Sequence, residues 1–355
     1  MDRVAICIPS FNNEHMIKRL LDSIEKQTYR NFIVVISDDS ITSNVQELVK
    51  NYNSFRLIYH RNSSSLGPTE NTNNAIKMAM VYSPDYIKVM HHDDYFSFEY
   101  SLQNLVELLD NHPECDMAFC GTYQVREDDK YNRAITEEQV KLLKQDFRIL
   151  TIGNYIGAPS AVIVRNKEIF LDENLVWLVD VEWYLRILQI NPEFVFTEAP
   201  LVSIGVSNTQ VTNSCLSDPA LMLRENIYIY KKHMFVQNEV FAKKIIYDTD
   251  NYLKLCSIIK KCKNFEKVYI YGAGSKGKYY VPFLEKNHIK IQGFVVSDGH
   301  KEVEFIGKYP VLELHQMVKS FSSESGILFA LNEKNYREVI SEMTYIDNNN
   351  IIYIR

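Results

Sequence analysis

Two carboxylates stand side by side in the segment His91-His92-Asp93-Asp94, directly after an apolar run that predicts a strand over 86–90. Adjacent carboxylates repel each other, so we expect a cation close by. Oxygen ligands beside a diphosphate suit Mg²⁺ or Mn²⁺, which proteins hold through one or two carboxylates and the phosphates of a substrate. The segment therefore predicts a divalent metal site at Asp93 and Asp94. The two histidines could add ligands, although packing beside a strand end is the more common role of such residues.

A proline and four polar residues follow the first two predicted strands, which span 4–8 and 32–37. They are Pro9, Ser10, Asn12, Asp38 and Asp39. We expect Pro9 to end its strand, and the side chains after it to lie at the rim where parallel sheets bind ligands. A carboxylate at that rim can accept a hydrogen bond from the N–H of a uracil or from ribose hydroxyls. The alternative is a pair of polar turns that cap the following helices.

Asp180 stands at the start of a segment with helical spacing that runs over 181–189. One interpretation is an N-cap that accepts a hydrogen bond from the first turn of the helix. The other is a general base that takes a proton from an attacking hydroxyl. Glu182 and Arg186 are spaced as i and i+4 on this helix, which predicts an ion pair on its surface.

Strands and helices alternate along this first part of the chain. Continuous apolar runs predict the strands, and apolar residues three or four apart predict the helices between them. This order is typical of repeated βαβ units and predicts a parallel, doubly wound α/β sheet. Ligands bind outside the carboxyl ends of such strands, where the polar residues described above stand. The predicted strands span 4–8, 32–37, 55–60, 86–90, 117–125 and 161–164, and the predicted helices span 14–27, 45–52, 72–81, 102–110, 137–149 and 181–189.

A glycine-rich turn opens a second alternating unit later in the chain. Gly272, Gly274 and Gly277 form the pattern G-x-G-x-x-G between a predicted strand over 268–271 and a helix, and Asp298 follows the next strand. In dinucleotide sites such glycines let the backbone approach a pyrophosphate, and the acid binds a ribose. The unit could therefore bind NAD(P), but we favour a Rossmann-like module used for packing, oligomerisation or partner docking.

These patterns predict three domains. They are residues 1–217, a helical linker over 218–264, and a small Rossmann-like domain over 265–355. The linker carries aromatic residues and two lysine pairs, Lys231-Lys232 and Lys243-Lys244. Capture at a membrane surface usually takes about four to eight basic residues. We therefore favour packing between the domains over membrane contact for this linker.

The composition limits the classes of partner and compartment. The 355 residues carry 39 Lys and Arg against 45 Asp and Glu, a net charge of −6 that argues against a nucleic-acid surface. The six cysteines form no C-x-x-C pair, so we expect reduced thiols. The chain shows no signal-peptide pattern and no apolar stretch near the roughly 20 residues of a membrane span. We expect a cytoplasmic protein, with peripheral contact at the inner face of the plasma membrane as the alternative.

Five motifs, taken in order, resemble one family. They are IPSFNN, SDDS, LGPTENTNNA, HHDD and VDVEWYLR. Together they resemble the family-two glycosyltransferases of GT-A fold. The resemblance implies an inverting transfer from a nucleotide-diphosphate sugar, with UDP as the expected nucleotide and Mn²⁺ or Mg²⁺ as the cofactor. It also implies a hydroxyl acceptor on a glycan or a lipid-linked glycan, as in bacterial surface polysaccharide synthesis.

The resemblance assigns roles to individual residues. It implies that Asp93 binds the metal, with Asp94 sharing that role, and that Asp180 is the catalytic base. The residues implied in donor binding are Pro9, Ser10, Asn12, Asp38, Asp39, Asn71, Asn73, His92 and Asp93.

The chain departs from the family pattern at several positions. His91 replaces the first acid of the D-x-D motif, Thr72 replaces an arginine, and Val179 replaces the glutamate of the Glu-Asp motif. Gly205 and Ser207 stand where many relatives carry an arginine and a histidine near the diphosphate. Two other functions therefore stay open: a sugar-modifying oxidoreductase that uses the C-terminal unit, and a nucleotide-sugar binding or scaffold protein without catalysis.

Overall fold

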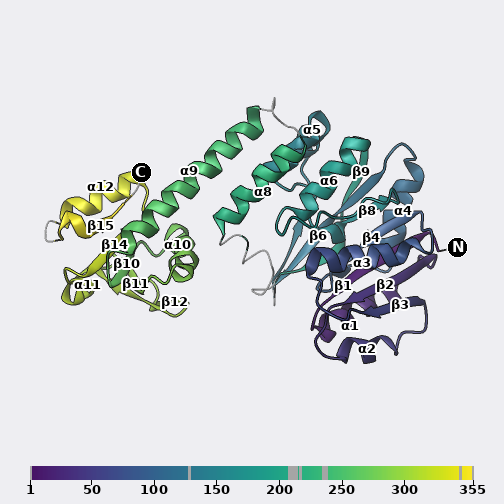
Figure 1. Cartoon of the computed structure of the whole chain (residues 1–355), viewed down its shortest axis with the longest axis horizontal. Coiled ribbons are helices and arrows are strands. Elements are labelled where there is room, and N and C mark those ends of the chain that lie inside the picture. Colours follow the sequence, from purple (N-terminus) through teal and green to yellow (C-terminus); the bar gives the residue numbers. More distant parts are fainter. Residues whose placement is uncertain are drawn as a thin grey trace. The chain divides into compact units, whose positions relative to one another are not determined.

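The computed structural model of the chain describes residues 2–126, 129–206, 215, 218–233, 239–343 and 346–353 (Figure 1). The chain forms two compact units. The first comprises Met1–Val211 and Tyr228–Phe235, and the second comprises Thr212–Ile227 and Val236–Arg355. The predicted domain boundary at residue 217 lies outside the described residues, and the division into three domains stays a prediction.

Nine strands of the described residues form the mixed sheet of the first unit. They are β1 (Val4–Ser10), β2 (Phe32–Asp38), β3 (Arg56–Arg61), β4 (Tyr86–Val89), β5 (Tyr95–Phe96), β6 (Met117–Arg126), β7 (Asp129–Arg133), β8 (Val162–Arg165) and β9 (Phe194–Gly205). Their order is β3-β2-β1-β4-β8-β6-β9-β5, and β7 pairs with β6. β1 runs parallel to β2 and β4, whereas β8 runs antiparallel to β4 and β6. The parallel half matches the predicted βαβ units, and the other half makes the sheet mixed.

Helices alternate with the strands of the first unit. They are α1 (Glu14–Glu25), α2 (Asn44–Val49), α3 (Pro68–Met80), α4 (Ser101–Asn111), α5 (Glu137–Gln145) and α6 (Val179–Ile190). Every residue of β1 and β2 is buried, so both faces of these strands are covered. Strands covered on both faces have continuous apolar sequences, which is why they could be predicted. α1 instead buries a single stripe of residues, Ile17, Leu20, Leu21 and Ile24, at helical spacing.

β1 continues past Pro9, so the prediction that this proline ends the strand is wrong. Pro9 pairs with Ser37, and Ser10 pairs with Asp38, on the side of β2, while pairing with β4 ends at Cys7. Proline has no N–H to donate, so it fits a position where the strand has already lost its partner on one side. β1 therefore carries Ser10 to the carboxyl edge of the sheet.

The sequence patterns do not predict β5, β7 or β9. β7 is exposed along its whole length and polar, so it shows no apolar alternation. β9 is irregular at its middle, where its register against β6 shifts beside Gly121. A Cβ on Gly121 would lie 2.2 Å from the carbonyl oxygen of Glu198, so only glycine permits this close approach.

The second unit contains a smaller sheet with Rossmann-like order. Its strands are β10 (Lys267–Tyr271), β11 (Ile291–Val296), β12 (Phe305–Ile306), β13 (Tyr309–Glu313), β14 (Ser325–Phe329) and β15 (Ile351–Ile352). They are ordered β12-β13-β11-β10-β14-β15, and all pairs except β12 with β13 are parallel. Its helices include α9 (Glu239–Cys262), α10 (Ser275–Lys286), α11 (Leu314–Ser320) and α12 (Glu333–Glu342), and α8 (Pro219–Lys232) contributes residues to both units. Among the described residues, no helix has the length and apolar character needed to cross a membrane.

Candidate active site

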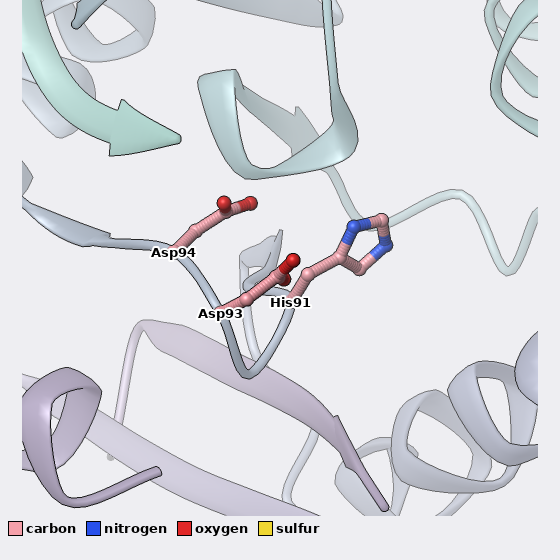
Figure 2. A group of neighbouring side chains, drawn as sticks. All are labelled: His91, Asp93 and Asp94. Carbon is pink, nitrogen blue, oxygen red and sulfur yellow. The ribbon is translucent and has the colours of Figure 1, made fainter. Parts of the chain in front are cut away.

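The segment 91–94 forms a turn directly after β4, at the edge where β1 and β2 also end. One ligand atom from each of His91, Asp93 and Asp94 lies within 4.8 Å of the others. Figure 2 shows the three side chains leaving the same turn of the chain. The structure thus brings the two predicted metal ligands together with His91, one of the two histidines that the sequence offered as additional ligands.

Ser160 holds this turn in place. Its hydroxyl accepts the N–H of His91 at 2.9 Å and hydrogen-bonds the carboxylate of Asp94, and its carbonyl accepts a hydrogen bond from the fully buried Lys88. Burial raises the pKa of Asp94, and the negative charge of Asp93 raises it further. Burial lowers the pKa of Lys88 to about 8. The ammonium of Lys88 therefore lies beside the acidic turn and acts against the rise in the pKa of Asp94. The divalent cation expected beside the adjacent carboxylates stays a prediction.

The end of β9 packs against the same turn. The N–H of Gly205 donates to Oδ1 of Asp94 at 3.0 Å. A Cβ at this position would lie 2.5 Å from the carbonyl oxygen of Asp93, so the approach requires glycine. Arg19 donates to that same carbonyl and lies over the ring of Tyr95, 4.4 Å from its centre. The close packing against Asp93 therefore explains why position 205 carries glycine and not a larger residue of the family pattern.

The side chains of this turn fit a divalent metal. An imidazole nitrogen and two carboxylates are donors that suit Mn²⁺, and His91, Asp93 and Asp94 supply them within one cluster. His92 is half-buried and is not part of the cluster, so its contact with a donor stays a prediction. Ser207, where the family pattern also departs, lies outside the described residues.

Asp39 lies at the edge of the sheet, and its two carboxylate oxygens differ in the number of hydrogen bonds that they accept. Its Oδ2 accepts the backbone N–H groups of Leu66 and Gly67, each at 2.9 Å, which fixes the loop before α3. Its Oδ1 accepts one hydrogen bond from the amide of Asn62, at 2.7 Å. A carboxylate oxygen can accept two hydrogen bonds, so Oδ1 can accept one more hydrogen bond, for example from a ligand.

Asp38 and Ser10 differ in how the protein satisfies them. Asp38 is fully buried and accepts hydrogen bonds from the hydroxyls of Tyr59, at 2.7 Å, and Ser40. Asp38 therefore stabilises the loop after β2. Its contact with a nucleotide-sugar donor stays a prediction. The Oγ of Ser10 is also buried but finds no hydrogen-bond partner among the described residues. An unpartnered buried hydroxyl is unfavourable unless something else supplies its partner.

The loops after β1 and β2 are joined by Asn12. It has a positive φ of 47°, its N–H donates to Oγ of Ser40 at 2.8 Å, and its Oδ1 accepts the N–H of Ile41 at 2.8 Å. Asparagine tolerates this left-handed backbone better than most residues, so its type follows from the turn. The structure gives Asn12 this structural task, and its contact with a donor stays a prediction.

The two predicted asparagines of α3 are both buried. The amide of Asn71 donates to the carbonyl of Ser10 at 3.1 Å and accepts from Asn62, so it lies at the carboxyl edge. The amide of Asn73 instead bonds both the N–H and the carbonyl of Leu171, at 2.8 and 2.9 Å. The structure therefore uses Asn73 to hold the segment before α6, and its contact with a donor stays a prediction.

Asp180 is the second residue of α6, and Leu178 occupies the N-cap position. Its Oδ1 accepts the N–H of Val181 at 2.8 Å, and its Oδ2 accepts the side-chain amide of Asn154 at 2.8 Å. The N-cap interpretation is therefore wrong. Burial raises the pKa of Asp180 to about 6, although these hydrogen bonds and the charge of Arg133 act against it.

The loop over 154–160 connects Asp180 with the acidic turn. Asn154 at its start bonds Asp180, and Ser160 at its end bonds both His91 and Asp94. The base candidate and the metal candidate therefore share one short positioning segment. The sequence showed this segment only as a loop before a strand, because its contacts reach residues far along the chain.

The raised pKa of Asp180 predicts a pH-dependent loss of stability. The folded state favours the protonated carboxyl, so its contribution is fully present below the ordinary pKa of 3.8 and is lost as the pH rises through about 6. In Asp180→Asn this loss is absent. We expect the unfolding free energy of the variant, relative to wild type, to increase by at most about 3 kcal/mol between pH 4 and pH 7.5. Denaturant unfolding across that range checks this, and a constant difference between the two proteins would contradict the raised pKa of Asp180.

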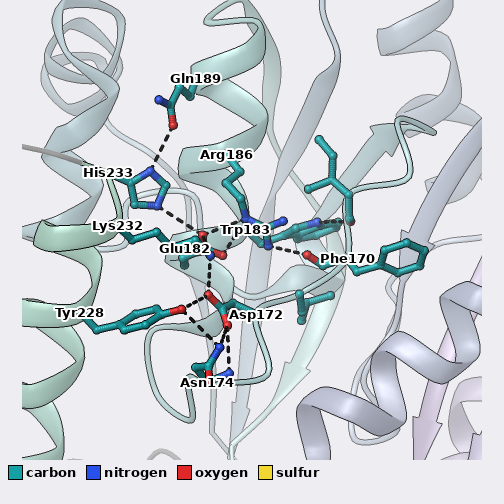
Figure 3. Close-up of polar contacts among 12 residues, drawn as sticks. Phe170, Asp172, Asn174, Glu182, Trp183, Arg186, Gln189, Tyr228, Lys232 and His233 are labelled. Carbon is teal, nitrogen blue, oxygen red and sulfur yellow. Dashed lines mark hydrogen bonds and ion pairs between the residues drawn. The ribbon is translucent and has the colours of Figure 1, made fainter.

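A buried ion network anchors the other side of α6 (Figure 3). Glu182 is fully buried and accepts hydrogen bonds from Arg186 at 2.8 Å, Lys232 at 2.7 Å and His233 at 3.3 Å. The prediction of a surface pair between Glu182 and Arg186 is therefore wrong, because the end of α8 covers this face. Burial alone would raise the pKa of Glu182, but the three partners outweigh it and hold the pKa at about 2.

Asp172 extends this network toward the loop before α6. It accepts hydrogen bonds from Lys232 and from the hydroxyl of Tyr228, the latter at 2.8 Å, and from Asn174. Burial opposes ionisation, but these donors hold the pKa of Asp172 well below its usual range. Lys232 thus bridges two buried carboxylates of the first unit.

Lys232→Met is expected to destabilise the protein by about 2–3 kcal/mol, because it leaves Asp172 and Glu182 short of a cation in a buried setting. Lys231→Met, at the exposed neighbouring position, is the matched control and should change little. The depressed pKa values mean that the network contributes above about pH 4.5 and fades as the pH falls through the folded-state values. Equal stability of the two variants at pH 7.5 would show that the network contributes nothing measurable.

The glycine turn of the second unit has the geometry of a tight strand-to-helix connection. Gly272 has a φ of +110°, and a Cβ on Gly277 would lie 2.0 Å from the carbonyl oxygen of Gly272. A Cβ on Gly274 would meet nothing within 4 Å. Asp298 is exposed and accepts hydrogen bonds from the backbone and ring of His315, at 3.0 and 2.9 Å. Binding of NAD(P) here stays a prediction.

Comparison with known proteins identifies the first unit. Residues 5–170 match the family described as Glycosyl transferase family 2. An abequosyltransferase of Salmonella typhimurium is 28% identical over 181 residues, which cover 46% of this chain and 53% of that protein. A UDP-Glc:alpha-D-GlcNAc-diphosphoundecaprenol beta-1,3-glucosyltransferase of Escherichia coli is 32% identical over 91 residues, which cover 26% of this chain and 35% of that protein. The match thus spans about half of the first relative and a third of the second.

Among solved structures, S. aureus TarS in complex with UDP is similar to 63% of this chain and 65% of that one, with 22% identity and a TM-score of 0.48. The family match covers the parallel half of the sheet and the acidic turn. The first unit is therefore a family-2 glycosyltransferase domain with the GT-A fold. This confirms the predicted family and the predicted fold class.

Proposed function

We propose that the chain is a metal-dependent, inverting glycosyltransferase that moves a sugar from a UDP-sugar to a hydroxyl of a glycan or lipid-linked acceptor. One observation carries the proposal: the loop over 154–160 holds Asp180 at one end and the His91, Asp93 and Asp94 cluster at the other. A base and a metal cluster on one short support are what a single displacement at a sugar carbon needs.

Asp180 acts as the base in this proposal. The acceptor hydroxyl gives its proton to the carboxylate of Asp180 while its oxygen attacks the anomeric carbon. The bond between that carbon and the diphosphate breaks on the opposite face, and the bonding electrons leave with the diphosphate. With a pKa of about 6, Asp180 is mostly ionised at neutral pH and still basic enough to take the proton.

His91, Asp93 and Asp94 would hold the divalent cation. When bound, such a cation neutralises charge on the diphosphate leaving group. Arg19 holds the backbone of this turn through the carbonyl of Asp93. Lys88 holds Ser160, whose hydroxyl accepts the N–H of His91.

The proposed donor is a UDP-sugar. Oδ1 of Asp39 has room for one further donor, such as the N–H of a uracil, and the hydroxyl of Ser10 lacks a partner among the described residues. The E. coli relative is named for UDP-Glc and a GlcNAc-diphosphoundecaprenol acceptor, which supports the proposed UDP-sugar donor and the proposed lipid-linked acceptor. A lipid-linked acceptor of this kind would bring the protein to the membrane surface during bacterial surface polysaccharide synthesis.

A donor screen tests this function. The purified protein is incubated with a set of nucleotide sugars, with and without Mn²⁺, and with a lipid-linked sugar diphosphate as acceptor. We expect sugar transfer, or slow hydrolysis of the donor, from a UDP-sugar and only when Mn²⁺ is present. Transfer that proceeds equally after chelation would remove the metal from the proposal. A thermal shift with NAD(H) and none with UDP would instead favour the oxidoreductase alternative.

A further inference from the structure

We propose that Arg133, on the exposed face of the β6–β7 hairpin, binds an anionic group of the acceptor beside the accepting hydroxyl. This inference rests on the proposed function, because it assigns Asp180 as the base. It adds a substrate class to that function: acceptors that carry a phosphate, a diphosphate or a carboxylate next to the accepting sugar.

The guanidinium of Arg133 is anchored next to Asp180. Its Nη2 donates to the carbonyl of Asn154 at 2.7 Å, and the side-chain amide of the same Asn154 donates to Oδ2 of Asp180 at 2.8 Å. Gly157 has a φ of +110°, and a Cβ there would lie 3.2 Å from Nη1 of Arg133. The bare backbone of this glycine therefore leaves space for the guanidinium beside the base.

The charge of Arg133 is not neutralised by an ion pair among the described residues. Its anchor is a neutral carbonyl, and the carboxylate on which its charge acts is Asp180. A guanidinium has five N–H donors, so most of its donors stay available to a ligand. An exposed, fully charged arginine with free donors is suited to a phosphate or carboxylate, which it can bind in a bidentate way.

The strand that carries Arg133 adds an aromatic side chain to the same face. Tyr131 is 56% exposed and two residues away, and residues at this spacing point to the same side of a strand. Lys130 belongs to the opposite face, where its ammonium lies 3.7 Å from the centre of the Tyr123 ring. A broad exposed ring beside a guanidinium offers a sugar an apolar surface and its anionic substituent a cation.

The hairpin as a whole is not basic, because residues 126–133 carry three basic and three acidic side chains. The attraction of an anionic acceptor group therefore depends on the guanidinium of Arg133 beside the base, and not on a basic surface. Alternatively, Arg133 could act only through Asp180, by keeping its carboxylate ionised, and the test must separate the two.

The test compares two acceptors that differ only in charge: a sugar linked through a diphosphate to a short alkyl chain, and the same sugar as a neutral alkyl glycoside. For Arg133→Met we expect the KM of the charged acceptor to rise about 10- to 100-fold, with the KM of the neutral acceptor and of the donor unchanged. Arg133→Lys should recover part of the loss. Lys130→Met, the same charge change on the other face of β7, is the matched control and should behave as wild type.

The opposite outcome is equally clear. If Arg133→Met lowers kcat to the same extent with both acceptors and moves the acid limb of the pH profile upward, the residue acts through Asp180 alone and the proposal is wrong. The groups that face Asp180 in that case are Arg133 and Tyr184, with the amide of Asn154 and the N–H of Val181.

A binding measurement separates this inference from the proposed function. An alkyl diphosphate without a sugar is titrated into the protein by calorimetry in the presence of saturating UDP and Mn²⁺, so that turnover is not needed. Binding to wild type that weakens in Arg133→Met, but not in Lys130→Met, supports the anion site even if no sugar transfer is found. No binding to wild type overturns the inference while leaving the transferase assay to decide the function.

Discussion

Asp180→Asn is expected to lower the rate of sugar transfer by about 10²–10⁴-fold, because a positioned base contributes an effect of this size. Asparagine keeps the shape of the side chain and its hydrogen bond with the N–H of Val181, so the loss reports on proton transfer. The affinity for UDP in the presence of Mn²⁺ should stay at the wild-type value. Steady-state kinetics and calorimetry on the same preparation check both statements.

The control for this variant is Glu107→Gln, which neutralises an exposed carboxylate of α4. It should leave the turnover unchanged. In wild type, kcat should fall below an apparent pKa of about 6, because protonated Asp180 cannot accept the proton of the acceptor. Wild-type turnover by Asp180→Asn would exclude Asp180 as the base.

Asp93→Ala is expected to weaken Mn²⁺-dependent UDP binding by roughly 100-fold or more. Loss of residues that merely orient a metal ligand already costs about 10- to 100-fold in affinity, and Asp93 belongs to the ligand cluster itself. Calorimetric titration of UDP into the protein, with and without Mn²⁺, measures the effect. His91→Ala should produce a smaller loss of the same kind, since two carboxylates remain.

Glu107→Ala serves as the matched control for Asp93→Ala, and it should bind UDP and Mn²⁺ as wild type does. If Asp93→Ala binds UDP with wild-type affinity and the same dependence on Mn²⁺, the cation is held elsewhere. The unfolding transition of Asp93→Ala verifies that the variant is folded. The substitution keeps the backbone carbonyl of residue 93 and therefore its hydrogen bond with Arg19.

Sequence patterns were sufficient for the residues that stand at the ends of apolar strands. Asp93 and Asp94 could be predicted because β4 is buried and the chain turns polar directly after it. The resemblance to a family supplied Asp180, which a helical pattern alone could not distinguish from a cap. In β1 and β2, which are covered on both faces, the predicted strands agree with the structure except at their ends, where β1 continues through Pro9 to Ser10.

The positioning residues could not be predicted, because they act across large distances in the sequence. Asn154 contacts a residue 26 positions away, and Ser160 contacts one 69 positions away. Neither has a local signal beyond a polar residue in a loop. Lys88 lies within a run that predicts a strand, and only the packed structure shows that its ammonium is buried beside Asp94.

Glu182 shows the opposite limitation. Its i to i+4 spacing with Arg186 correctly indicates the pair, but spacing does not show which face of a helix is covered. Lys232 at the end of α8 and His233 directly after it turn an expected surface pair into a buried network (Figure 3). Pairing between elements that are far apart in sequence is tertiary information.

A crystal structure with UDP and Mn²⁺, with the manganese located by its anomalous signal, tests the joint arrangement of metal cluster and base. We expect one manganese peak bound to Asp93 and the diphosphate, and the carboxylate of Asp180 facing the space beyond the β-phosphate where the sugar carbon would lie. A manganese peak away from the turn over 91–94 would contradict this arrangement. So would a bound UDP whose β-phosphate is not faced by the carboxylate of Asp180.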